Sequence, residues 1–277
     1  MGIALGLFAA LFYGAADFCG GLATRRSSMF AVAIISQAVG FAILLVIVPF
    51  FHGHASPIDY VWGLLAGICG GLGLALLYHA LSIGKMGVVS PITAVLAASL
   101  PVIVGVVRGE HLVLAQAIGI GAALLAVILI SLSSEPDGKR EFATAGVREA
   151  IFSGIVLGGF YLFLARAGPH AGLYPLITAR IGSIVFLLLV ALALRQSVRP
   201  ARGAIGLIAL AGSIDMTANA LYVLATFAGY LSIAAVLTSL YPASTVLLAR
   251  VVLKERLQRV QWIGIALALV GVGLIAI

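Results

Sequence analysis

The chain has 277 residues, of which 63% are hydrophobic and only 9% are charged, and its mean hydropathy is +1.23. A soluble domain is about half apolar and about one quarter charged, so this composition excludes a water-soluble globular protein and predicts an integral membrane protein. The formal net charge of +7 is therefore expected to reflect basic loops on one side of a membrane and no affinity for nucleic acid.

Ten segments are long and apolar enough for a helix that crosses the bilayer, which needs about 20 such residues. In chain order they lie near residues 2–23, 29–50, 60–82, 88–107, 112–132, 149–166, 174–194, 204–226, 231–252 and 258–277. The longest connection, residues 133–148, is charged and contains a Pro-Asp-Gly turn signal. It is expected to be a linker between two halves, residues 1–132 and residues 149–277.

The two halves resemble each other at a constant offset of 145 residues. Residues 109–130 match residues 254–275, and this pairs Glu110 with Glu255 and the Ile-Gly-Ile triplet at 118–120 with the one at 263–265. A duplicated unit of five helices has an odd number of spans, so its second copy enters the membrane from the opposite side. The sequence thus predicts an all-α integral membrane protein, with ten transmembrane helices as two inverted five-helix repeats around a central cavity. This is the architecture of alternating-access transporters.

Three charged residues lie well inside predicted spans: Asp17, Arg180 and Asp215. An ionisable side chain at the centre of a membrane helix costs about 3 kcal/mol on insertion scales, and it usually faces a partner or a water-filled cavity. One interpretation is a salt bridge between Arg180 and one of the aspartates that only fixes the bundle. The other is a polar transport site.

Further polar side chains on several predicted helices favour the transport site. Asp215, Asn219 and Tyr222 recur at i, i+4 and i+7 along one helix face, and glycines beside Asp17 allow close approach of a helix or a ligand. His79 either lines the cavity or binds a backbone carbonyl. The predicted substrate-binding residues are Tyr13, Asp17, Gln37, Tyr78, Arg180, Asp215, Asn219, Tyr222 and Tyr241.

The last two predicted helices, "SLYPASTVLLARVVLKERLQRVQWIGIALALVGVGLI", resemble the C-terminal signature of the EamA family in the drug/metabolite transporter superfamily. The matching features are Pro242, Glu255 thirteen residues later, and Gln261-Trp262. The resemblance extends over all ten spans and implies eight helices around a central cavity, with the fifth and tenth at the periphery. One departure is Ala97, which stands at the first-half position that matches Pro242.

The basic residues predict the orientation of the chain in the cytoplasmic membrane. Two of them, Arg108 and Arg166, follow even-numbered spans. Thirteen follow odd-numbered spans: Arg25, Arg26, Lys85, Lys139, Arg140, Arg148, Arg195, Arg199, Arg202, Arg250, Lys254, Arg256 and Arg259. Since basic loops stay on the cytoplasmic side, both termini are expected outside the cytoplasm. Many relatives in the family have the reverse arrangement.

These features predict a secondary transporter, an exporter of small organic metabolites that works as a monomer or weak homodimer in the lipid bilayer. Arg180 suits a carboxylate and an aspartate suits an ammonium group, which favours a zwitterion such as an amino acid. If Arg180 is instead paired with an aspartate, the free acid and the tyrosines favour a lipophilic cation, and hence drug export. Asp17 is expected to hold a proton until substrate or a change of pH displaces it, so that Asp17 couples transport to protons.

The other function classes have weaker support in the sequence. A membrane-embedded enzyme would need a catalytic motif, and neither HExxH nor GxSxG is present. A channel or scaffold does not explain the inverted duplication. The sequence contains no Walker A motif, so energy is expected to come from a proton or solute gradient. No metal or cofactor is predicted, because Cys19 and Cys69 lie in apolar segments without a CxxC spacing.

Overall fold

The computed structural model describes residues 2–51, 53–107, 114–134, 140–142, 145–227 and 240–275. The helices in these ranges are α1 (Gly2–Thr24), α2 (Met29–Ile47), α3 (Pro57–Ile83), α4 (Met86–Val107), α5 (Leu114–Ser131), α6 (Val147–Leu164), α7 (Tyr174–Ala193), α8 (Ile205–Phe227), α10 (Tyr241–Val252) and α11 (Arg259–Ile275). Short 3-10 helices follow α2 (Val48–Phe50) and precede α7 (Pro169–Ala171). The first part of the predicted ninth span, up to residue 239, lies outside the described residues, as do Glu110 and its neighbours at 108–113.

Most of these helices have the length and the apolar surface of membrane-spanning helices. Six of the described helices, namely α1, α2, α3, α6, α7 and α8, contain a stretch long and apolar enough to cross a membrane. Large apolar side chains point outward from them; Val46 of α2 is 67% exposed and Leu192 of α7 is 77% exposed. Such exposure is costly in water and favourable in hydrocarbon. The chain is therefore a multi-pass membrane protein, as its composition predicts.

A small hairpin stands in the predicted linker. Strand β1 (Leu132–Ser134) pairs antiparallel with β2 (Arg140–Phe142), and Leu132 lies opposite Phe142. The pairing gives hydrogen-bond partners to backbone groups that have left the helical ladder of α5. Residues 135–139, which include the Pro-Asp-Gly signal, lie outside the described part of the chain.

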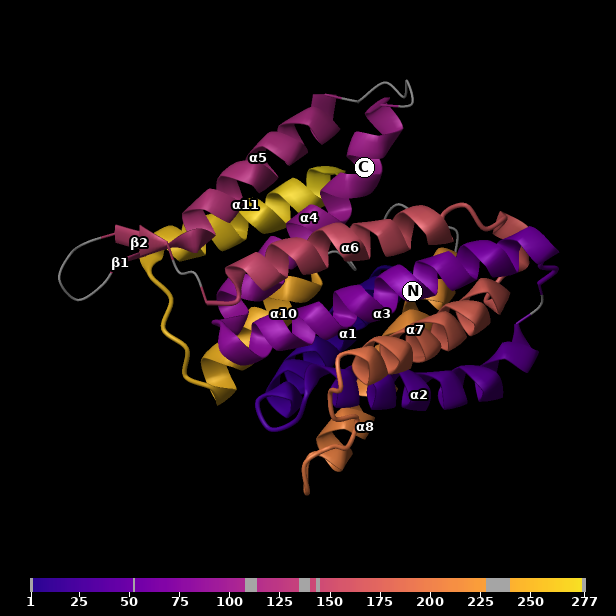
Figure 1. Cartoon of the computed structure of the whole chain (residues 1–277). Helices are drawn as coiled ribbons and strands as arrows, with labels where there is room; N and C mark the ends of the chain where they lie inside the picture. The colour runs from indigo at the N-terminus through magenta and orange to yellow at the C-terminus, as the bar shows by residue number, and fades with distance from the viewer. Residues whose placement is uncertain are drawn as a thin grey trace.

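The helices pack mainly on partners that are distant in the sequence. Helix α3 packs on α6 and α7, while α8 packs on α1 and α2. In the same way α4 packs on α6, and α10 packs on α1. Helices α5 and α11 lie side by side against α4, away from α2, α7 and α8 (Figure 1). This is the peripheral position that the family resemblance implies for the fifth and tenth spans.

Glycines bring the crossing helices of different halves into direct backbone contact. Along α3, a Cβ at Gly63 would collide with the carbonyl oxygen of Pro175, and one at Gly67 with that of Ala179, both on α7. The contact between α8 and α2 is of the same kind, since a Cβ at Gly212 would collide with the carbonyl oxygen of Ser36. Small residues at such crossings allow the close packing that drives helix association in lipid.

Gly67→Ala is expected to lower the free energy of unfolding by about 1–3 kcal/mol, because the added methyl group forces two helix backbones apart. The measurement is the thermal unfolding midpoint in detergent. Gly206→Ala in α8 is the matched control, since no described atom lies within 4 Å of a Cβ placed there. Equal midpoints for the two variants would contradict the close crossing of α3 and α7.

Candidate central transport site

The first cluster of the site is an ion pair between α7 and α8. Arg180 Nη2 donates to Asp215 Oδ2 at 2.8 Å, and Arg180 Nη1 donates to Gln37 Oε1 on α2. The Arg180 and Asp215 side chains are 11% and 21% exposed. Asn219 Nδ2, one turn further along α8, donates to the Asp215 backbone oxygen at 2.8 Å and lies 3.4 Å from Asp215 Oδ2. Polar groups of three helices thus satisfy the guanidinium and its partner.

The room for this guanidinium comes from a glycine. A Cβ at Gly40 of α2 would lie 3.5 Å from Arg180 Cζ and 3.5 Å from the carbonyl oxygen of Gly212 on α8. Since 3.5 Å is an ordinary contact distance, a methyl group would fit at Gly40, and only a longer side chain would reach into the space of the ion pair.

Asp17 on α1 is partly buried and stands apart from this ion pair. Within the described ranges, no hydrogen bond or ion pair reaches its carboxylate, although the Asp215 carboxylate interacts with it electrostatically. The structure therefore answers the question that the sequence left open: Arg180 pairs with Asp215 and not with Asp17. A carboxylate without a protein partner in a membrane interior is the group most open to an added cation.

Tyrosines from five helices surround the two aspartates. We call them the tyrosine cluster: Tyr13 of α1, Tyr78 of α3, Tyr161 of α6, Tyr222 of α8 and Tyr241 of α10. The Tyr78 and Tyr161 hydroxyls interact electrostatically with both Asp17 and Asp215, that of Tyr241 interacts with Asp17, and that of Tyr13 with Asp215. Tyr222 joins through Tyr13 and Tyr161. Electrostatic interactions thus connect these tyrosines with the two aspartates, while hydrogen bonds join Arg180, Gln37, Asp215 and Asn219.

Sequence reasoning missed Tyr161. Its ring is 49% exposed and makes an edge contact with Phe160 at 5.3 Å between ring centroids. A comparison of the repeats could have identified it, because under the 145-residue offset Tyr161 corresponds to Ala16, the neighbour of Asp17 in the sequence. Thr245 is buried and its Oγ1 donates to the Gly14 carbonyl at 3.1 Å, which ties α10 to α1.

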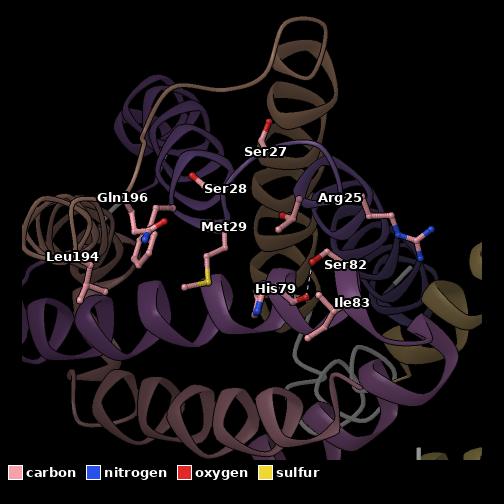
Figure 2. A pocket seen from close by; sticks show the side chains of 11 residues that line it. Arg25, Ser27, Ser28, Met29, His79, Ser82, Ile83, Leu194 and Gln196 are labelled. Carbon is pink, nitrogen blue, oxygen red and sulfur yellow. Dashed lines mark hydrogen bonds between the residues drawn. The ribbon is translucent and has the colours of Figure 1, made fainter. Parts of the chain in front are cut away.

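A hollow lies where the turn between α1 and α2 meets the last turns of α3 and the residues that follow α7. We call it the basic-end pocket; its volume is about 550 Å³. It is lined by Thr24, Arg25, Ser27, Ser28, Met29, Phe30, His79, Ser82, Ile83, Leu194 and Gln196 (Figure 2). His79, for which the sequence offered two interpretations, belongs to this pocket. In Figure 2 the guanidinium of Arg25 points away from the other labelled side chains.

The Arg25 guanidinium points toward the carboxylate of Glu255. This carboxylate accepts the backbone N–H groups of Met86 and Gly87 at 3.0 and 3.1 Å, and it lies 4.0 Å from Arg25 Nη2. A carboxylate at the first turn of α4 interacts favourably with the positive end of the helix dipole. Glu255 thus joins the loop after α10 to α4 and to the α1–α2 turn.

The opposite end of the bundle is held together by another carboxylate. Asp59, in the first turn of α3, accepts the Gly168 N–H at 2.7 Å and the Ser56 N–H at 2.8 Å. The His54 N–H donates to the His170 carbonyl at 2.8 Å. These bonds tie the α2–α3 loop to the α6–α7 loop, so the two halves are joined at the end that carries few basic residues.

The sequence model of the EamA-like transporter family matches residues 1–132 and 145–277. The chain belongs to this family and is a membrane transporter of the drug/metabolite type. An uncharacterized protein of Methanocaldococcus jannaschii is 27% identical over 134 residues, which are 97% of that protein and 48% of this chain. A protein known from a crystal structure shares the fold, with a TM-score of 0.57 and 16% identity over 99% of this chain and 95% of the other.

Proposed function

We propose that the chain is a secondary transporter that exports an organic cation with an aromatic or apolar body, bound between Asp17 and the tyrosine cluster. The observation that carries this proposal is the pairing of Arg180 with Asp215 and Gln37, while no described residue binds the Asp17 carboxylate. A free carboxylate attracts a cation, and tyrosine faces stabilise a cation through their π systems. The family membership supports transport, and the site supports the charge of the cargo.

The zwitterion favoured by the sequence becomes the second candidate. A substrate carboxylate would have to replace Asp215 on Arg180 Nη2, which already holds that oxygen at 2.8 Å. Among the described residues the replaced aspartate would then keep Asn219 alone and would stand uncompensated inside the bundle, which is costly. An amino acid therefore binds only if the ion pair opens.

The inverted repeat is proposed as the basis of alternating access, with halves at residues 1–132 and 149–277 joined by a linker at 133–148. Under the 145-residue offset, helices α1, α2 and α3 correspond to α6, α7 and α8. Exchanging the two halves turns the contact of α3 with α7 into that of α8 with α2, and the contact of α3 with α6 into that of α8 with α1; both members of each pair are present. The relative from Methanocaldococcus jannaschii is matched over 97% of its own length by 48% of this chain. A protein of this length supports the proposal that one five-helix half is a unit that can occur as a separate chain.

Cysteine labelling in intact cells tests both the inversion and the proposed orientation. A cysteine placed in residues 82–87 is expected to react with a membrane-impermeant maleimide only after the cells are opened, because the basic loops face the cytoplasm. A cysteine placed in the repeat-related residues 227–232 is expected to react from outside. Labelling of both segments from one side would contradict the inversion, and a clean reversal of the two results would overturn the orientation alone.

A binding screen tests the proposed cargo. Purified protein is titrated with a lipophilic cationic dye, a polyamine, an aromatic amino acid and a nucleobase. The dye is expected to bind, and Asp17→Asn is expected to weaken that binding by about tenfold to a hundredfold, the loss of one charge-assisted contact. Glu149→Gln is the matched control, since this carboxylate pairs with Arg148 at the start of α6. Binding of the amino acid but not the dye, lost in Arg180→Ala, would overturn the cation proposal.

A further inference from the structure

A line of residues on α1 connects the basic-end pocket with the central site. Thr24 lines the pocket, Gly20 lies one turn further in, and Asp17 follows within the next turn. Positions four and seven residues apart share one face of a helix. At a rise of 1.5 Å per residue, Asp17 lies about 10 Å deeper along the helix than Thr24.

The neighbouring helices repeat this arrangement. On α2, Phe30 lines the pocket, and Gln37, seven residues on, holds Arg180. On α3, Ser82 lines the pocket, and Tyr78, four residues deeper, interacts electrostatically with both central aspartates. Three helices therefore present the same faces first to the pocket and then to the central site, so the two spaces lie one behind the other.

Buried side chains lie between the pocket and the central site. Tyr78 is only 1% exposed and its ring lies against Gly20, where a Cβ would collide with the ring carbons. Ile34, on the α2 face between Phe30 and Gln37, is 8% exposed. The Tyr78 ring is thus the bulky one of these side chains, and Gly20 is the residue that leaves space for it.

We infer that the basic-end pocket is the vestibule through which the substrate reaches Asp17, and that the Tyr78 ring resting on Gly20 is the barrier between them. The choice of an organic cation as the substrate rests on the proposed function. Met29 and Phe30 provide apolar and aromatic surface for its body. The Arg25 guanidinium points away from the hollow (Figure 2) and lies 4.0 Å from the Glu255 carboxylate, which offsets its repulsion of a cation.

The barrier can be tested without any substrate. In a background with Cys19→Ala and Cys69→Ala, Ser36→Cys places a thiol on α2 beside Tyr78, where residue 36 is 3% exposed. A charged methanethiosulfonate applied from the basic side is expected to react with this thiol at least tenfold faster when Tyr78→Ala is added. Tyr78→Phe, which keeps the ring, is expected to leave the reaction slow. Equal rates in all three proteins, or acceleration only from the opposite side, would overturn the barrier.

The vestibule is tested by blocking it. Ser82→Cys in the same background is modified with a bulky maleimide, and Arg202→Cys, exposed at the same end but outside the pocket lining, is the matched control. Uptake of the cationic dye into proteoliposomes is expected to fall at least tenfold after modification at position 82 and to persist after modification at position 202. Undiminished uptake after modification at position 82 would overturn the vestibule. If the unmodified protein binds no cation, the proposal of a cationic substrate is wrong. The reaction rates of Ser36→Cys with the methanethiosulfonate still decide whether Tyr78 is a barrier.

Discussion

Arg180→Ala is expected to lower the free energy of unfolding by about 3–5 kcal/mol, because it leaves Asp215 as an unpaired charge inside the bundle. Asp215 would keep only the Asn219 amide, which lies 3.4 Å from its carboxylate oxygen. The measurement is reversible unfolding in mixed micelles. Arg148→Ala is the matched control: its side chain is 80% exposed and its ion pair with Glu149 lies at the surface, where such a pair contributes about 0–1 kcal/mol.

A double substitution separates a structural role of Arg180 from a ligand role. If the ion pair fixes the bundle, Arg180→Met combined with Asp215→Leu removes both charges and is expected to recover most of the lost stability, since apolar replacements of buried pairs are often neutral. Dye binding at Asp17 is expected to survive in the double variant. A single Arg180→Ala protein of undiminished stability that has lost only carboxylate ligands would instead identify Arg180 as a substrate ligand.

The sequence identified the charged residues of the site but not how they pair. Asp17, Arg180 and Asp215 stand out in a sequence because each is expensive inside a membrane. Their pairing depends on the rotation and separation of α1, α7 and α8, which follow from backbone contacts such as that of Gly212 with Ser36. A single sequence records the glycine but not the helix that it faces, so the partner of Arg180 had to come from the structure.

Features built from distant connections were also beyond sequence reasoning. The basic-end pocket combines the α1–α2 turn with Ser82 in the last turn of α3 and Gln196 after α7. None of these positions is unusual by itself, because hydroxyl and amide side chains are ordinary at helix ends. Glu255 stands out in the sequence through the repeat, but its backbone partners Met86 and Gly87 are distant from it in the chain.

Asp17→Asn is expected to abolish proton-driven uptake of the cation, with a loss of at least tenfold in proteoliposomes that carry a pH gradient. A proton and a cationic substrate compete for one carboxylate, so binding of either weakens binding of the other by the same factor. In the wild type, substrate affinity is accordingly expected to rise with pH as the competing proton becomes scarce. An asparagine at position 17 cannot take up the proton, so the residual affinity of the Asp17→Asn protein for the cation is expected to be independent of pH.

Asp215 is the alternative carrier of the proton, and its geometry argues against it. Its Oδ2 atom accepts a hydrogen bond from Arg180 Nη2 at 2.8 Å, so this oxygen already has a protein donor. Asp17 has no such partner among the described residues. Equal pH dependence of dye binding in Asp17→Asn and the wild type would overturn the assignment of coupling to Asp17. If dye binding loses its pH dependence in Asp17→Asn but keeps it in Glu149→Gln, the proton and the substrate bind to the same carboxylate. Competition for one carboxylate is sufficient for a carrier to exchange protons against substrate.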